Sequence, residues 1–223
     1  LIALYFIFFL NDVGGKTTNK INKNFGSFFK RDHISLIIII ILNISQQVSL
    51  VNGVLMFYAS IIKNSKSIIV NTSEELSSVI LTSINLISNI LATFIVVKYE
   101  KPVRIFIVSE ILVAITLIFL GLEFEAAIFS YLFLFFFSLG MGPLIWSICV
   151  KILDKENLEV GIATGNIINY IFCIFSTFIF GTLMGSQYRN MFFFVASFLL
   201  LISAWLLYYF NMIKEKSQSI NLY

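Results

Sequence analysis

Long apolar runs alternate with short polar segments along almost the whole chain. Six of these runs have about the 20 residues that an α-helix needs to cross the hydrocarbon layer of a bilayer. They cover residues 34–62, 79–97, 103–122, 126–150, 160–184 and 191–213. Runs of this length are too long for strands, although they are rich in Ile and Phe. The pattern therefore predicts an all-α protein, a polytopic bundle of six transmembrane helices.

The polar segments divide the chain into three parts. Residues 1–33 are expected to hold the end of a preceding helix or an interfacial segment, followed by a basic linker. Residues 34–213 are expected to form the six-helix bundle, and residues 214–223 a tail. The chain begins with Leu1, and its opening LIALYFIFFL is only about half a span, so we expect more protein upstream.

The composition fits a membrane protein and disfavours several other classes. The chain is 59% hydrophobic and 12% charged, where soluble domains have about 45–50% and 25%. Its net charge of +3 is small and its basic residues are spread between the runs, so nucleic-acid binding is not expected. Cys149 and Cys173 lie inside apolar runs, and no catalytic or metal-binding motif occurs. We expect no enzyme activity, no metal and no cofactor.

The basic residues are distributed unevenly between the two sides of the predicted bundle. With the linker on the cytoplasmic side, twelve Lys and Arg residues lie inside and three outside. Inside are Lys16, Lys20, Lys23, Lys30, Arg31, Lys98, Lys101, Arg104, Lys151, Lys155, Lys214 and Lys216; outside are Lys63, Lys66 and Arg189. Cytoplasmic loops of membrane proteins carry such an excess. The distribution predicts that the linker and the C-terminus are cytoplasmic.

Amide side chains interrupt the first run in the stretch SQQVSLVNGV. Asn43, Gln46 and Gln47 are spaced to lie on one face of a helix, and Asn52 is expected to lie off that face. Amides are costly in hydrocarbon unless they face a partner or a water-filled cavity. A carboxamide both donates and accepts hydrogen bonds, as a sugar hydroxyl does. Two interpretations stay open: a helix that lines an aqueous cavity, or amides that bond neighbouring helices at about 0.6 kcal/mol each.

Later runs also carry polar or irregular positions. GMGPLIW, residues 140–146, contains Pro143, which kinks a helix, and Trp146, whose flat face suits either a pyranose ring or simple packing. GIATGNIINY, residues 161–170, has two glycines in GxxxG spacing, which favours close helix contact. Glu110 is the one acid well inside a run, and it is either an ion or proton carrier or a structural acid.

These segments, in this order, resemble the second half of the sugar porter family, the hexose transporters of the major facilitator superfamily. That family carries Q-Q-[LIV]-[ST]-G-x-N in its seventh helix, G-P-x-P-W in its tenth and an asparagine followed by an aromatic residue in its eleventh. The matching residues are Gln46, Gln47, Ser49 and Asn52 for the first motif, Gly142, Pro143 and Trp146 for the second, and Asn169 and Tyr170 for the third.

The resemblance implies the C-terminal six-helix half of a major facilitator fold, packed against an N-terminal half of the same polypeptide. It implies transport of a hexose by alternating access at a site near the midplane of a bilayer, which we expect to be the plasma membrane. The implied sugar ligands are Gln46, Gln47, Asn52 and Asn169, with Trp146 as a stacking wall. The eighth helix of the family supplies a further asparagine, for which the candidates are Asn85 and Asn89.

Several positions depart from the family pattern. Leu50 replaces the motif glycine, Ile145 the second proline, Ser138 a sugar-binding glutamate and Lys151 an acid beyond the tryptophan. The cytoplasmic motif [DE]-R-x-G-R-R is reduced to KYEKPVR, so the family's cytoplasmic charge network cannot form as usual. Two alternatives to a hexose carrier therefore stay open: a sugar receptor that does not transport, and a carrier or channel for another small solute. Uniport and proton symport are also left undecided.

Overall fold

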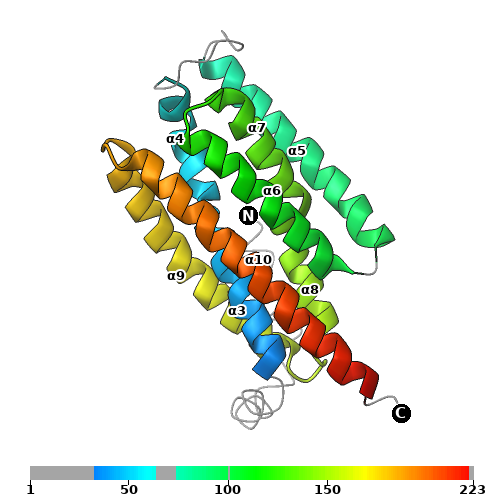
Figure 1. Cartoon of the computed structure of the whole chain (residues 1–223). Coiled ribbons are helices and arrows are strands. Elements are labelled where there is room, and N and C mark those ends of the chain that lie inside the picture. Colours follow the sequence, from blue (N-terminus) through cyan, green and yellow to red (C-terminus); the bar gives the residue numbers. More distant parts are fainter. Residues whose placement is uncertain (1–32, 64–73, 100, 221–223) are drawn as a thin grey trace, which may run out of the picture.

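The computed structural model describes residues 33–63, 74–99 and 101–220, and every regular element in these ranges is a helix. The elements are α3 (His33–Val48), α4 (Val51–Lys63), α5 (Glu74–Lys98), α6 (Pro102–Gly121), α7 (Ala126–Phe136), the π-helix η1 (Phe137–Met141), α8 (Leu144–Ile152), α9 (Leu158–Met184) and α10 (Arg189–Ile220), as shown in Figure 1. The predicted opening half-span and nearly all of the predicted linker lie outside the described residues.

Six helical segments in the described residues are long and apolar enough to cross a membrane. They are His33–Ile61, Glu75–Ile95, Pro102–Gly121, Ala126–Ile152, Leu158–Met184 and Arg189–Lys216. The all-α fold and the six predicted spans are thereby confirmed. Two spans are broken, because the first consists of α3 and α4 and the fourth of α7, η1 and α8. The last helix also continues beyond residue 213, where the apolar run ends, and reaches Ile220.

The spans run up and down in one bundle, with α5 and α9 on opposite edges and α6 and α10 side by side between them (Figure 1). Helix α3 packs on α9 and α10, while α5 packs on α7 and η1. Only 17% of the α5 span and 11% of the α9 span is buried, against 50% for α6. The two edge helices therefore present broad apolar faces to their surroundings.

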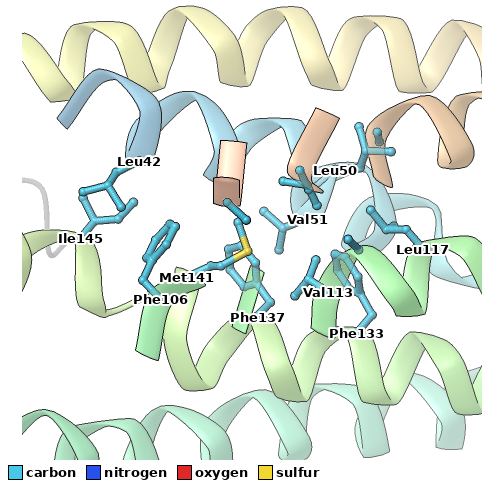
Figure 2. Packing of buried hydrophobic residues seen from close by; sticks show 14 of the residues in the cluster. Leu42, Leu50, Val51, Phe106, Val113, Leu117, Phe133, Phe137, Met141 and Ile145 are labelled. Atoms are coloured by element: carbon cyan, nitrogen blue, oxygen red, sulfur yellow. The ribbon is translucent and has the colours of Figure 1, made fainter. Parts of the chain in front are cut away.

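The core lies where the two broken spans meet α6. Figure 2 shows Leu42 from α3 and Met141 from η1 among buried side chains contributed by α4, α6, α7 and α8. Phe106, Val113 and Leu117 of α6 are fully buried within this cluster. The packing holds both helix breaks against one continuous helix, so the breaks have fixed positions.

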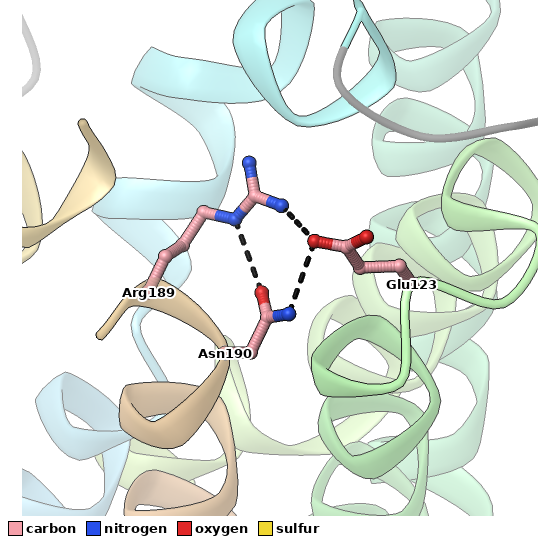
Figure 3. A network of polar contacts seen from close by, with 3 residues as sticks. All are labelled: Glu123, Arg189 and Asn190. Atoms are coloured by element: carbon pink, nitrogen blue, oxygen red, sulfur yellow. Dashed lines mark hydrogen bonds and ion pairs between the residues drawn. The ribbon is translucent and has the colours of Figure 1, made fainter. Parts of the chain in front are cut away.

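A polar cluster joins α6 to α10 at the end of the bundle where α10 begins (Figure 3). Asn190 Nδ2 donates to Glu123 Oε1 at 3.0 Å, Arg189 Nε donates to Asn190 Oδ1 at 3.2 Å, and the Arg189 guanidinium also pairs with Glu123. The hydrogen bond from Asn190 and the charge of Arg189 hold the pKa of the Glu123 carboxyl below its ordinary value. This cluster fixes the connection between α6 and α7 over the start of α10.

Candidate functional site

The break between α3 and α4 decides where the amide side chains point. Leu50 has a φ of 65°, and its N–H bonds Gln47 O at 3.2 Å, which ends α3 with a left-handed residue. Helix α4 then restarts at Val51 with a new rotational register. Asn52, expected off the glutamine face on an unbroken helix, is thereby brought onto it. That expectation was wrong because the helix is not continuous.

Four predicted site residues form one connected hydrogen-bond network. Asn169 Nδ2 donates to Gln46 Oε1 at 2.7 Å, and Gln47 Nε2 donates to Asn169 Oδ1 at 2.9 Å. Asn52 Nδ2 donates to Gln47 Oε1 at 3.0 Å and also lies 3.2 Å from Cys173 Sγ. Gln47 is buried, while the other three amides are partly exposed. The network therefore joins α3, α4 and α9 and reaches the surface of the described bundle.

The irregular fourth span supplies backbone acceptors to this network. Gln46 Nε2 donates to Met141 O at 3.1 Å and lies 3.4 Å from Gly142 O. These carbonyls are at the end of η1, where Gly142 N bonds Phe137 O in the wide pattern of a π-helix. The break before α8 therefore presents main-chain oxygens to Gln46, a role that side-chain motifs alone do not predict.

Asn85 belongs to a second polar cluster. Its Oδ1 accepts hydrogen bonds from Ser138 Oγ at 2.7 Å and from Asn89 Nδ2 at 2.8 Å. Both candidate asparagines of α5 are thus connected to each other, and Asn85 is the one bonded to η1. Since η1 also provides Met141 O to the first network, the two clusters meet the same short segment from different helices.

The aromatic residues of the motifs lie outside both clusters. Trp146 is 45% exposed on α8, one turn beyond Gly142, and Tyr170 is 65% exposed beside Asn169 on α9. Neither side chain takes part in the amide network described above. Their exposed faces leave them available to a ligand, to lipid or to another part of the protein.

Asn43 and the two GxxxG glycines serve the contact between α3 and α9. Asn43 lies on the side of α3 that packs on α9, and its Nδ2 donates to Ile39 O in its own helix at 2.9 Å. A Cβ added to Gly165 would lie 2.8 Å from Asn43 Nδ2, and one added to Gly161 would lie 2.4 Å from Leu153 Cδ1. The absence of a side chain at these positions favours this close approach, which places Asn169 within reach of Gln46 and Gln47.

Three partners of the network were missed by sequence reasoning. They are the carbonyls of Met141 and Gly142 and the thiol of Cys173. Cys173 stands four residues after Asn169 and so shares its helix face, a signal that could have identified it. The carbonyls leave no such signal because every residue has one.

Glu110 is fully buried on α6 and accepts a hydrogen bond from Ser203 of α10, and its two predicted roles stay open. Among the described residues, no group of three or more His, Cys, Asp or Glu side chains is placed to hold a metal ion.

Comparison with known proteins identifies the family of this chain. Residues 12–222 match the family model described as sugar (and other) transporter. The chain is also similar to the facilitated trehalose transporter Tret1 of Bombyx mori, with 28% identity over 154 residues. The matched part covers 62% of this chain and 30% of that relative, so the chain spans less than a third of the relative's length. This integral membrane protein belongs to the sugar transporter family of the major facilitator superfamily.

Proposed function

We propose that this chain is the C-terminal half of a carrier that moves a sugar across a membrane by alternating access. Its six spans would pack against an N-terminal half, which would provide the opposite wall of a site near the midplane. The plasma membrane is the proposed location, with the linker and the C-terminus in the cytoplasm. The amide network of Gln46, Gln47, Asn52 and Asn169 carries the proposal.

The chemistry of the network suits reversible binding of hydroxyl groups. Each amide already has hydrogen-bond partners, so a sugar hydroxyl that both donates and accepts would exchange one bond for another. A net intramolecular hydrogen bond is worth only about 0.5–1.5 kcal/mol, which keeps such an exchange close to balanced. A nearly balanced exchange lets a carrier release its substrate on the second side. Trp146 and Asn85 are proposed to complete the site as a stacking surface and a further ligand.

The proposed substrate is a hexose or a sugar built from hexose units. The motif resemblance favours a single hexose, and the similarity to a trehalose transporter favours trehalose as the second candidate. Both present pyranose hydroxyls to amide groups, so the same network serves either one. Binding of the two sugars should therefore depend on the same residues.

Uptake measurements test this proposal. The full reading frame is produced in cells that lack their own sugar carriers, and uptake of labelled D-glucose and labelled trehalose is measured. We expect uptake of at least one sugar, and about a tenfold loss of affinity in Gln47→Ala, because one net bond is lost and its partners are left unsatisfied. Gln187→Ala is the matched control, since Gln187 lies exposed between α9 and α10. A Gln47→Ala variant that transports like the control would contradict the proposed site.

A thiol-protection assay separates a carrier from a sugar receptor that does not transport. Cys173 is partly buried beside Asn52, whereas Cys149 is buried. Sugar bound at the network should slow alkylation of Cys173 by N-ethylmaleimide, with Cys173→Ser as the background control. Protection together with uptake supports the carrier, and protection without uptake supports the receptor. Neither protection nor uptake with glucose or trehalose would contradict a sugar site and favour another solute.

A further inference from the structure

A pocket of about 160 Å³ lies at the end of the bundle opposite the cluster of Glu123 and Arg189. It is formed by the start of α6, the end of α8 and the last turns of α10. Its lining residues are Lys101, Pro102, Val103, Arg104, Lys151, Ile152, Asn211, Lys214 and Glu215. The amide network does not include any of these residues, so the pocket is separate from the proposed sugar site.

Positive charge predominates in this pocket. Four of its lining residues are Lys or Arg and one is Glu, which leaves a formal charge of +3 (four minus one). Arg104 and Glu215 are 3.7 Å apart, but their side chains are 59% and 44% exposed, so solvent screens the pair strongly. Asn211 Nδ2 also donates to Glu215 Oε1 at 3.2 Å. The lining therefore contains more basic than acidic side chains.

The start of α6 increases the positive potential of the pocket. Helix α6 begins here at Pro102, and its N-cap residue Lys101 makes no side-chain capping bond. The dipole of α6 favours an anion at that position. Pro102 has no N–H and the Arg104 N–H bonds Lys101 O at 3.2 Å, so the dipole contributes here rather than a row of free N–H groups. The opposite dipole of α8 ends at Ile152, whose carbonyl accepts a hydrogen bond from Lys214 Nζ. The α8 carbonyl is thus satisfied within the protein, while the start of α6 opens toward the pocket.

The pocket lies where the apolar α6 span begins. The α6 span begins at Pro102, with Pro102 and Val103 buried and Lys101 exposed, so the lining crosses from apolar to polar surroundings. Basic pockets between transmembrane helices are suited to phosphorylated head groups. Arg104 adds a planar guanidinium, which can bind two oxygens of one phosphate.

We propose that this pocket binds a phosphate monoester group, provided by an anionic lipid head group or by a soluble phosphate compound. A dianion there would bind basic side chains from α6, α8 and α10 at the same time. Because a ligand stabilises the arrangement that binds it, phosphate would hold these three helix ends together. Where the chain works as the proposed carrier, this would bias the equilibrium between its two access states.

Binding measurements on the purified full-length protein in phosphatidylcholine nanodiscs test the proposal. The probes are labelled phosphatidic acid and labelled inorganic phosphate, which both present a phosphate that can carry two negative charges, and phosphatidylglycerol, whose phosphodiester carries one. If only phosphatidic acid binds tightly, the phosphate comes from a lipid. If inorganic phosphate binds, with or without phosphatidic acid, a soluble ligand is sufficient. Each of these outcomes supports the pocket. Equal affinity for phosphatidic acid and phosphatidylglycerol would overturn it, because membrane surface charge alone would then explain binding.

Paired variants locate the bound phosphate. The double variant Lys101→Gln/Lys151→Gln should bind about 25-fold more weakly, at about fivefold for each cation removed near a membrane surface. Lys98→Gln/Lys155→Gln removes the same charge from the same end of the bundle, outside the pocket lining, and should leave affinity unchanged. Lys101→Arg/Lys151→Arg retains the charge and should retain binding, which separates charge loss from misfolding. Equal weakening in both glutamine pairs would overturn the assignment.

Discussion

At the scale of single residues, Leu50 is the departure from the family motif with the clearest structural consequence. It occupies the position of the motif glycine and adopts the left-handed conformation that glycine favours, with a φ of 65°. Its side chain is nonetheless buried in the core beside α6 (Figure 2). Left-handed backbone costs a residue with a Cβ about 1–2 kcal/mol. The packing of this leucine must offset that cost to maintain the break that places Asn52.

The opposition between backbone cost and side-chain packing predicts which of two variants at position 50 is the more stable. Leu50→Ala and Leu50→Gly lose the same packing, but only glycine relieves the backbone, so Leu50→Gly should be more stable by about 1 kcal/mol. Val54, which is buried inside α4, is the control position. There the alanine variant should be more stable than the glycine variant by about 1 kcal/mol. Thermal unfolding in detergent measures both pairs. If Leu50→Ala were at least as stable as Leu50→Gly, the backbone at position 50 would be shown to be unstrained.

The site could be anticipated from sequence only as a set of residues. Gln46, Gln47, Asn52 and Asn169 were selected by motif resemblance, and the structure brings them together. Their connectivity could not be predicted, because it depends on a left-handed leucine that propensity disfavours. The helical period likewise placed Asn43 with the glutamines, but its amide bonds its own backbone. Periodicity describes faces, whereas hydrogen-bond choice depends on the neighbouring helices.

At the scale of elements, the π-helix η1 depends on a close contact with α6. Ser109 Oγ donates to Phe136 O at 2.6 Å and accepts from Met141 N at 3.2 Å, so one hydroxyl spans the segment. The approach is possible because Gly140 has no side chain. A Cβ there would lie 2.3 Å from Ser109 Cβ, well inside contact distance. The acceptor carbonyls for Gln46 are held in place by this contact.

Gly140→Ala should therefore destabilise the protein by about 1–3 kcal/mol, the usual cost of overpacking a core. Gly185→Ala is the control, because a Cβ there meets nothing within 4 Å, and its effect should stay within about 0.5 kcal/mol. Ser109→Gly removes the atoms that clash, so the double variant Gly140→Ala/Ser109→Gly should be more stable than the sum of the single effects. Thermal unfolding is again the measurement, and strict additivity would show that this contact is not the cause.

The six spans were predictable because their length and apolar character are local properties. The interruptions were not equally visible. Pro143 indicated a kink in the fourth span, yet the π-helix precedes it and is stabilised from α6 by Ser109. In the first span the break lies at Leu50, where the family motif has glycine and where leucine itself does not favour a break. Tertiary packing decides both breaks, and the proposed site is built on them.

At the scale of the whole molecule, the described basic residues gather at one end of the bundle. The residues at this end are Lys98, Lys101, Arg104, Lys151, Lys155, Lys214 and Lys216, whereas Lys63 and Arg189 lie at the other end. Since cytoplasmic loops carry the excess of Lys and Arg, the end with the phosphate pocket is predicted to face the cytoplasm.

Cysteine labelling from the two sides of the membrane tests this orientation. Lys155→Cys lies between α8 and α9 at the basic end, and Gln187→Cys lies between α9 and α10 at the opposite end; both positions are exposed. In a background without other cysteines, an impermeant maleimide should label Gln187→Cys on intact cells and Lys155→Cys only after permeabilisation. The reverse pattern would place the basic pocket outside the cell. The anionic lipids that concentrate in the cytoplasmic leaflet could not then supply its phosphate, and a soluble extracellular phosphate would be the remaining source.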